Sequence, residues 1–309
     1  MKRLVFSAFT ALSLSACGDT LAPDVAAWEV PVLDATGHPT AASFMSCMEG
    51  KAAIVSAHRG GPAPGYPENA IETFLHTLSE VPALIETDVR ETADGVLILL
   101  HDDTVDRTTN GTGNASQMTL AEIKALRLVD ADGRLTEYRV PTLDEALEAM
   151  RGRTILQLDV KRGVGLAKVV RAVERAGAES YAAIITYNDN GAVIAAEAGD
   201  NITVIAGIDE YSDVASLGSR GLDRERLIAW TGIIDELEPD LYEALGELDI
   251  SASGGALRNI DRRAAEGEVG LYKVLEQAGL DVIATDMPVR AARYLGMSGI
   301  SEAIELCAL

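Results

Sequence analysis

Eight short runs rich in β-branched and apolar residues alternate with helical stretches, and this alternation limits the folds open to the chain. The runs span residues 53–58, 84–90, 155–160, 182–187, 202–208, 227–231, 248–252 and 282–286. Strands that alternate with helices form parallel sheets, since each crossover needs a dozen or more residues. Eight such units over roughly 240 residues predict an α/β protein with a closed (β/α)8 TIM barrel. An open doubly wound sheet is the alternative, but no glycine-rich dinucleotide fingerprint follows any run.

The stretches between the runs have the apolar spacing of amphipathic helices that pack on a sheet. Residues 71–78 show this spacing behind Asn69 and Glu72, and residues 143–150 show it behind Thr142 and Glu145. Each pair has the three-residue spacing of a capping box, so both stretches are predicted to begin with a side-chain cap.

One additional apolar run, residues 96–100, follows the second strand after a short link that contains Asp94-Gly95. A link this short predicts a hairpin, because a parallel crossover needs many more residues. We therefore interpret residues 91–140 as an excursion inserted after the second strand, which forms a small cap over one mouth of the barrel.

Three carboxylates and a lysine lie in or just after the second and third strands. Glu86 and Asp88 are two residues apart and share a strand face, as do Asp159 and Lys161. If these faces meet at the barrel mouth, the buried negative charge costs several kcal/mol per ion unless it is compensated. One divalent cation would compensate it, and oxygen ligands without a nearby cysteine favour Mg²⁺ or Ca²⁺. The alternative is a strand-end network of salt bridges.

Two of the chain's four histidines flank this cluster: His58 ends the first strand, and His101 ends the hairpin strand. Phosphodiester cleavage needs one group that takes a proton and one that gives a proton, and imidazole suits both tasks near neutral pH. We predict that the two histidines form this pair, with Arg59 facing an anionic substrate. A purely structural role is the alternative for either histidine, and it is the interpretation we give His38 and His76.

The chain resembles glycerophosphodiester phosphodiesterases in the order and spacing of its motifs between about residues 53 and 295. The motifs that carry the resemblance are His58-Arg59-Gly60, Pro67-Glu68-Asn69, Glu86-Thr87-Asp88, Asp94-Gly95, His101-Asp102, Arg107-Thr108-Thr109 with Gly111, Pro141-Thr142-Leu143, Asp159-Val160-Lys161, and Thr285-Asp286 with Pro288. The resemblance implies a barrel with a small cap after the second strand. It also implies hydrolysis of glycerophosphodiesters to glycerol 3-phosphate and an alcohol.

The same resemblance implies roles for individual residues. Those matching His58 and His101 are the acid and the base, and that matching Arg59 contacts phosphate. In the family, a metal also orients a glycerol hydroxyl for attack on phosphorus, and water then opens the resulting cyclic phosphate.

The residues matching Glu86, Asp88 and Asp159 bind that metal in the family. Glu68 and Lys161 match further site positions. We predict that Lys161 is a second phosphate-binding residue and that Glu68 has a secondary role.

The chain departs from the family pattern at two places. The third-strand carboxylate is usually Glu and is Asp159 here, one methylene shorter, which puts the metal geometry in doubt. The family's Trp-Thr pair near the seventh strand is displaced, because Trp230-Thr231 lies on the sixth predicted strand. Gly254-Gly255 near the later position has two interpretations, a loop that offers N–H groups to phosphate or a plain turn.

The first residues are typical of an export signal. Lys2 and Arg3 precede an apolar stretch, residues 4–14, that is too short to span a bilayer. Residues 14–17 read Leu-Ser-Ala-Cys, which resembles the lipobox at which bacterial lipoproteins are lipidated on the cysteine and cleaved. We predict lipid on Cys17; an ordinary secretory signal is the alternative.

These features divide the chain into three parts. Residues 1–16 are predicted to be the signal peptide, residues 17–50 a tether and N-terminal segment, and residues 51–309 the phosphodiesterase barrel. The protein would then lie in the bacterial cell envelope, on the periplasmic or outer face, held to the membrane by its lipid.

The charge of the mature chain excludes several partners. Loss of Lys2 and Arg3 with the signal takes the formal net charge from −22 to −24. Such a chain repels nucleic acid and anionic lipid, so a small-molecule phosphodiester would have to be bound by a local positive site. With Cys17 lipidated, Cys47 and Cys307 are the two remaining thiols in a compartment that permits disulfides, and we predict that they pair.

Two other functions compete with this interpretation. One is a lysophospholipase D or sphingomyelinase D type of enzyme that acts on intact lipids, which an apolar rim on the cap would favour; residues 102–117 are mostly small and polar. The other is a non-catalytic anchored binding protein, against which the intact His58, His101, Glu86 and Asp88 argue.

Overall fold

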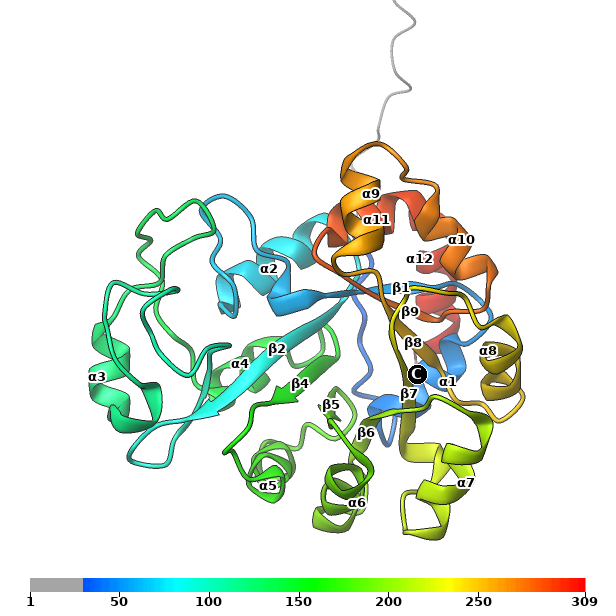
Figure 1. Ribbon diagram of the computed structural model, residues 1–309, viewed down its shortest axis with the longest axis horizontal. Coiled ribbons are helices and arrows are strands. Elements are labelled where there is room, and N and C mark those ends of the chain that lie inside the picture. The colour runs from blue at the N-terminus through cyan, green and yellow to red at the C-terminus, as the bar shows by residue number, and fades with distance from the viewer. Residues whose placement is uncertain (1–29, 309) are drawn as a thin grey trace, which may run out of the picture.

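The central feature of the fold is a closed barrel of eight parallel strands (Figure 1). The structure is a computed structural model that describes residues 30–308, so the predicted signal peptide and Cys17 lie outside the described residues. The strands follow one another around the barrel, and β9 pairs with β1 to close it. They are β1 (Ile54–Ala57), β2 (Leu84–Glu91), β4 (Leu156–Val160), β5 (Ala182–Ile185), β6 (Thr203–Gly207), β7 (Leu227–Ile233), β8 (Ala252–Gly255) and β9 (Val282–Thr285). The predicted TIM barrel is confirmed.

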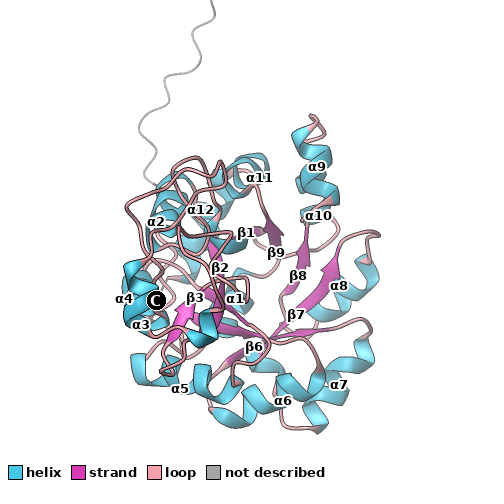
Figure 2. Ribbon diagram, turned by 60° about the vertical axis from the view of Figure 1, so that its left-hand side comes forward, coloured by secondary structure: helices cyan, strands magenta, loops and turns pink. Residues whose placement is uncertain are grey.

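Helices surround the barrel (Figure 2). They are α2 (Ile71–Glu80), α4 (Leu143–Met150), α5 (Leu166–Ala176), α6 (Asp189–Ala198), α7 (Tyr211–Ser219), α8 (Pro239–Gly246), α9 (Asn259–Ala265), α10 (Leu271–Gln277), α11 (Pro288–Leu295) and α12 (Met297–Cys307), with the short 3-10 helices η1 (His58–Gly60) and η3 (Arg224–Arg226). The predicted capping box of Thr142 and Glu145 begins α4. Gly177, with a φ of 59°, ends α5 in the left-handed conformation that glycine adopts at little cost.

The predicted cap of α2 is wrong. The helix begins after Ala70, which makes no side-chain cap. Asn69 has a φ of 57°, and its side-chain amide donates to Asp88 and accepts from Thr87. The capping spacing was present, but Asn69 contacts the second strand instead of its own helix.

The seventh predicted run is also misplaced, because the strand lies at β8, four residues later at its start. Ile250 donates its N–H to a carbonyl of the last turn of α8, and Asp249 has a φ of 58°, so both belong to a turn. Gly254 and Gly255 are paired inside β8, and a Cβ on Gly254 would lie 2.8 Å from Ile234 Cδ1. They therefore form neither a phosphate loop nor a turn. Because glycine has no Cβ, Ile233 and Ile234 can pack directly against them.

Residues between β2 and α4 form a lobe beside the barrel with a small core of its own. β3 (Leu97–Leu99) pairs antiparallel with β2 as a hairpin, and η2 (Ala115–Gln117) and α3 (Leu120–Ala125) follow it. The apolar side chains of this core are Ala70, Ile98, Leu100, Val105, Ala115, Ile123, Leu128 and Val140. The lobe carries His101 to the carboxyl ends of the barrel strands, where Arg107 bonds Glu68.

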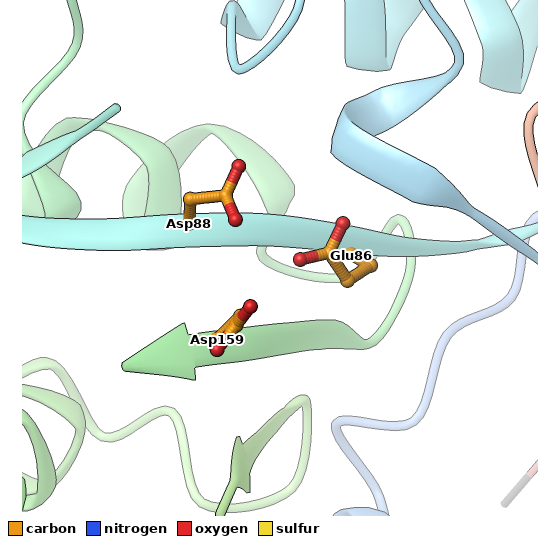
Figure 3. A group of neighbouring side chains, drawn as sticks. All are labelled: Glu86, Asp88 and Asp159. Atoms are coloured by element: carbon orange, nitrogen blue, oxygen red, sulfur yellow. The ribbon is translucent and has the colours of Figure 1, made fainter. Parts of the chain in front are cut away.

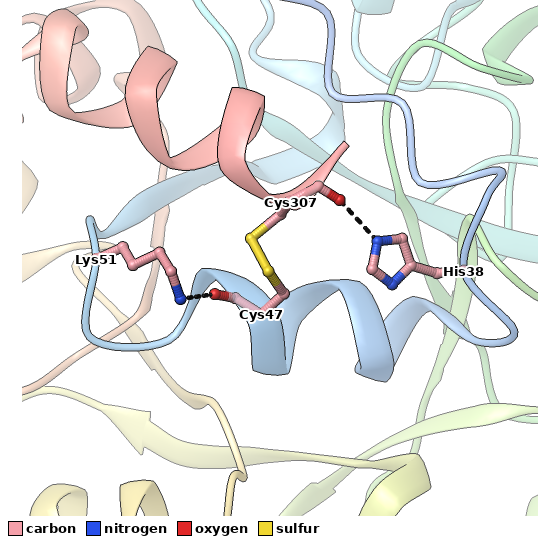
Figure 4. Close-up of a disulfide and its surroundings, with 4 residues drawn as sticks. All are labelled: His38, Cys47, Lys51 and Cys307. Carbon is pink, nitrogen blue, oxygen red and sulfur yellow. Dashed lines mark hydrogen bonds between the residues drawn. A yellow bond between two sulfur atoms is a disulfide. The ribbon is translucent and has the colours of Figure 1, made fainter. Parts of the chain in front are cut away.

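The segment before β1 is packed against the barrel. Leu33 is buried, although we assigned its position to a tether, and α1 (Ala41–Met48) contacts β5 and α12. Cys47 of α1 and Cys307 of α12 form a disulfide, and the His38 ring nitrogen Nε2 bonds the Cys307 carbonyl (Figure 4). Among residues 30–308, no helix combines the length and apolar character that a bilayer span requires.

Candidate active site at the carboxyl ends of the strands

Glu86, Asp88 and Asp159 point toward one another from two neighbouring strands (Figure 3). β2 pairs directly with β4, in a register that sets Asp88 opposite Asp159. One oxygen atom from each carboxylate lies within 4.8 Å of the others. Glu86 and Asp88 are buried, with 8% and 0% of their surface exposed. The alternation of side chains along each strand therefore brings the three predicted ligands together.

Electrostatics make this cluster unfavourable without further positive charge. Burial and the neighbouring Asp88 raise the pKa of Glu86 well above its usual value. Lys161 Nζ lies 2.6 Å from both Asp88 Oδ1 and Asp159 Oδ2. Burial alone would lower the pKa of Lys161, but the two carboxylates outweigh burial and raise it. One ammonium beside three carboxylates still leaves an excess of negative charge.

The donor set fits a hard divalent cation. Every ligand atom in the cluster is a carboxylate oxygen, the donor that such ions prefer. Asp88 Oδ1 is buried and makes no hydrogen bond, because its contact with Lys161 lacks hydrogen-bond geometry. This buried oxygen is ion-paired with Lys161 at 2.6 Å, and a bound cation would give it a coordinating partner as well.

Arg59 is held by carboxylates on two sides. Its φ of 53° is unusual for a residue with a side chain, and this conformation lets its N–H donate to Glu86 Oε2 at 2.7 Å. Its guanidinium lies 3.2 Å from Glu68 Oε2 and 3.8 Å from Asp88 Oδ2. We predict that Arg59 faces an anionic substrate, and in the structure its guanidinium lies between these two carboxylates.

Each predicted catalytic histidine bonds a carboxylate through Nδ1. His58 Nδ1 lies 2.7 Å from Asp286 Oδ1, and His101 Nδ1 lies 2.7 Å from Asp102 Oδ1. The histidine lowers the pKa of Asp286, while Arg107 and then His101 lower the pKa of Asp102. Asp102 and Asp286 belong to motifs already quoted from the sequence, but we had given neither a role.

Tyr187 is a further site residue that the sequence analysis missed. Its hydroxyl donates to Asp159 Oδ1, and burial together with that carboxylate raises the pKa of Tyr187. It follows β5 by two residues, and a polar side chain just past a barrel strand was the available signal.

A cavity of about 430 Å³ opens beside the carboxylates. His58, Glu86, Asp159, Tyr187 and Trp230 line it, together with apolar side chains of β5 and β6. Predicted residues that lie outside its lining are Arg59, Glu68, Asp88, His101 and Lys161. A larger hollow of about 660 Å³ lies at the amino ends of the strands, away from both histidines.

The fold and this mouth define a TIM-barrel protein with a cluster of three carboxylates that could hold a metal ion, beside a cavity that His58 also lines. The family model described as the glycerophosphoryl diester phosphodiesterase family matches residues 58–226, more than half of the chain. The chain belongs to this family.

Individual relatives agree with that assignment. The chain is 35% identical over 142 residues to the glycerophosphodiester phosphodiesterase of Caldanaerobacter subterraneus, an alignment that covers 44% of this chain and 58% of that protein. It is 37% identical over 110 residues to mouse glycerophosphodiester phosphodiesterase 1, covering 34% of this chain and 33% of the mouse protein. The chain therefore spans less than two thirds of these curated relatives.

Solved structures match over a larger share of the chain. The crystal structure of a glycerophosphoryl diester phosphodiesterase from Parabacteroides distasonis has a TM-score of 0.76 and 30% identity, and the match covers 86% of this chain and 93% of that one. A glycerophosphodiester phosphodiesterase from Agrobacterium tumefaciens has a TM-score of 0.64 and 26% identity, with 78% of this chain and 99% of that one covered.

Proposed function

We propose that this protein hydrolyses glycerophosphodiesters to glycerol 3-phosphate and an alcohol, with a divalent cation and two histidines. The observation that carries the proposal is the meeting of three carboxylates on β2 and β4 beside a cavity that His58 also lines. Family membership and the names of the relatives support the same reaction.

His101 and His58 would share the proton transfers. As an attacking glycerol hydroxyl forms a bond to phosphorus, His101 takes its proton, and His58 gives a proton to the departing alkoxide. The roles then reverse. His58 takes a proton from water as the water oxygen bonds to phosphorus. The bond between phosphorus and the glycerol oxygen that attacked first then breaks, and His101 returns its proton to that oxygen. Arg59 and Lys161 are the proposed cationic contacts for the phosphate.

Glu86, Asp88 and Asp159 would hold one cation, for which we propose Mg²⁺ or Ca²⁺. A bound ion of this kind would polarise the phosphoryl oxygens and offset the charge that develops on them. Asp159 is shorter than the glutamate usual in the family, and its hydrogen bond from Tyr187 holds it beside Lys161.

A substrate panel tests the proposed reaction. Purified protein is incubated with glycerophosphodiesters that differ in their alcohol, with lysophospholipids and with sphingomyelin, and glycerol 3-phosphate is measured. We expect glycerol 3-phosphate from the water-soluble diesters. Turnover confined to the lipids would instead establish a phospholipase D type of enzyme, and no turnover of any substrate would favour a binding protein.

Two substitutions at Asp159 test its proposed ligand role, one by cation binding and one by activity. Asp159→Asn removes one ligand charge and should weaken cation binding strongly, which isothermal titration with Mg²⁺ or Ca²⁺ measures directly. Asp159→Glu restores the family's usual residue and should keep measurable activity. Unchanged cation binding in Asp159→Asn would remove this residue from the site.

We also propose that the protein is anchored in the cell envelope by lipid on Cys17, and the support is the leader sequence alone. Mass spectrometry of protein extracted from its native membrane should find an N-terminus at a lipid-modified Cys17. An unmodified N-terminus at another residue would contradict the proposal.

A further inference from the structure

The two histidines share a feature that the proposed acid–base chemistry leaves unexplained. In each, Nδ1 is 2.7 Å from a carboxylate oxygen, of Asp286 for His58 and of Asp102 for His101. A neutral imidazole carries one proton, and a carboxylate at Nδ1 holds the proton on that nitrogen. The lone pair then lies on Nε2, which has no partner among residues 30–308 and is the atom left for the substrate.

Neither histidine–carboxylate pair is buried enough to be rigid by itself. The side chains of His58 and Asp286 are 25% and 52% exposed, and those of His101 and Asp102 are 33% and 30% exposed. Ion pairs between exposed side chains hold their geometry poorly, since water competes and both side chains lose entropy. Each carboxylate therefore needs an anchor of its own.

Asp286 is anchored by a buried carboxylate on α9. Asp261 is 5% exposed, and its Oδ2 accepts the backbone N–H of Asp286 at 2.7 Å. Its Oδ1 accepts the hydroxyls of Thr285 and Tyr272, each at 2.8 Å. Thr285 and Tyr272 are themselves fully buried. These bonds fix the turn between β9 and α11 that carries Asp286.

Asp102 is anchored by a cation from the same lobe. Arg107 Nε lies 2.6 Å from Asp102 Oδ2, and its two terminal nitrogens bond both oxygens of Glu68 at 2.7 and 2.8 Å. Glu68 also contacts Arg59. The Arg107 side chain is 48% exposed, but Glu68 is only 13% exposed, and the bidentate pair between them has a defined geometry. This pair joins the lobe that carries His101 to the barrel residue Arg59.

We propose that Asp286 and Asp102 are positioning residues that keep His58 and His101 in the Nδ1–H form, with Asp261 and Arg107 as their anchors. This inference rests on the proposed function for its catalytic consequence. Its structural consequence, the ring tautomer, is independent of any reaction.

The test combines NMR of ¹⁵N-histidine-labelled protein, which contains four histidines, with steady-state kinetics. In the wild type, neutral His58 and His101 should carry the proton on Nδ1. In Asp286→Asn, the new amide donates to Nδ1 and should shift the His58 proton to Nε2, while His101 stays unchanged. The value of kcat should fall by at least about 100-fold with little change in KM, because the ring then presents the wrong tautomer to the substrate. Asp102→Asn should do the same to His101 alone.

Asp261→Asn tests the anchor. It should disturb the His58 signal and lower kcat while His101 stays unchanged, whereas general destabilisation would affect both rings. A control for Asp102→Asn is Asp132→Asn, because Asp132 also pairs with an arginine of the same lobe, Arg134, and bonds neither His58 nor His101. That variant should leave kcat and all ring signals unaltered.

The outcomes separate the two proposals. Wild-type tautomers retained in both Asp286→Asn and Asp102→Asn would overturn the positioning proposal, as would a fall in kcat without any change in the rings. A wild type that shows the expected tautomers but hydrolyses no glycerophosphodiester would overturn the proposed function and leave the positioning geometry standing.

Discussion

His58 and His101 come from separate parts of the chain, one from the end of β1 and the other from the lobe after β3. Removing either imidazole removes a proposed proton carrier, so His58→Ala and His101→Ala should each reduce kcat by at least about 100-fold. Both rings are partly exposed, so the melting temperature should change little. Activity within a few-fold of wild type in either variant would remove that histidine from the mechanism.

Some residues of the site could be predicted from the sequence, and others could not. Glu86 and Asp88 were predictable because strand alternation puts them on one face, and β2–β4 pairing adds Asp159. Asn69 was misassigned because the capping spacing is local, while its bond to Asp88 depends on tertiary contact. The same limit applies to Asp261, which lies on α9 and reaches the site only through the backbone of Asp286.

Gly60 lies in the 3-10 turn η1, between β1 and α2, and comes close to the Phe74 ring of α2. Gly60 has a φ of 85°, and a Cβ there would overlap the Phe74 ring; Gly65 has a φ of 82° and nothing within 4 Å of a Cβ. Gly65→Ala should therefore cost only the left-handed strain, about 1–2 kcal/mol. Gly60→Ala should cost a further 1–3 kcal/mol or so from overpacking and should also disturb His58.

Urea unfolding followed by circular dichroism measures both variants. Equal unfolding free energies for Gly60→Ala and Gly65→Ala would mean that the close approach to Phe74 is unimportant.

β8 is the strand that the sequence located least well. Its residues, Ala-Ser-Gly-Gly, have little β propensity, while the preceding Leu248 and Ile250 alternate as a strand would. The packing of Ile233 and Ile234 against the glycines fixes the true strand, and this is a contact between neighbouring strands. Strands rich in valine and isoleucine, such as β6 and β9, lay within the predicted runs.

The disulfide ties the two ends of the barrel domain together. Cys47 and Cys307 are 260 residues apart, so the bond restricts the unfolded chain over nearly its whole described length. Replacing both by serine should lower the free energy of unfolding by up to about 5 kcal/mol. Activity at 25 °C should persist, because the disulfide joins α1 to α12 and not to the elements that carry His58 and His101. A reductant should lower the melting temperature of the wild type and not of the variant; equal effects would show that the bond does not form.

Glu49, which lines the hollow at the amino ends of the strands, should make the free energy of unfolding depend on pH. Burial, with help from Asp281 and Asp249, raises the pKa of Glu49 from 4.5 to about 7. The folded protein then holds this proton more tightly than the unfolded chain, so the stabilisation is full below pH 4.5 and is lost as the pH rises through about 7. Glu49→Gln should raise the melting temperature at pH 8 and change it little at pH 4.5. The same difference at both pH values would contradict this assignment.

For the molecule as a whole, the alternation of eight β-rich runs with helices was enough to predict the barrel. The meeting of Glu86, Asp88 and Asp159 was predictable as well, because the carboxyl ends of the strands of a closed barrel converge at one mouth. We propose above all that the carboxylates of β2 and β4 hold a divalent cation that the reaction requires.

Hydrolysis of a glycerophosphodiester by exhaustively chelated protein, before and after addition of Mg²⁺ or Ca²⁺, tests that claim most directly. We predict that chelation abolishes the release of glycerol 3-phosphate and that one of these ions restores it. Full activity in the chelated protein, with no bound metal by elemental analysis, would contradict the claim and return Glu86, Asp88 and Asp159 to a network of salt bridges with Lys161.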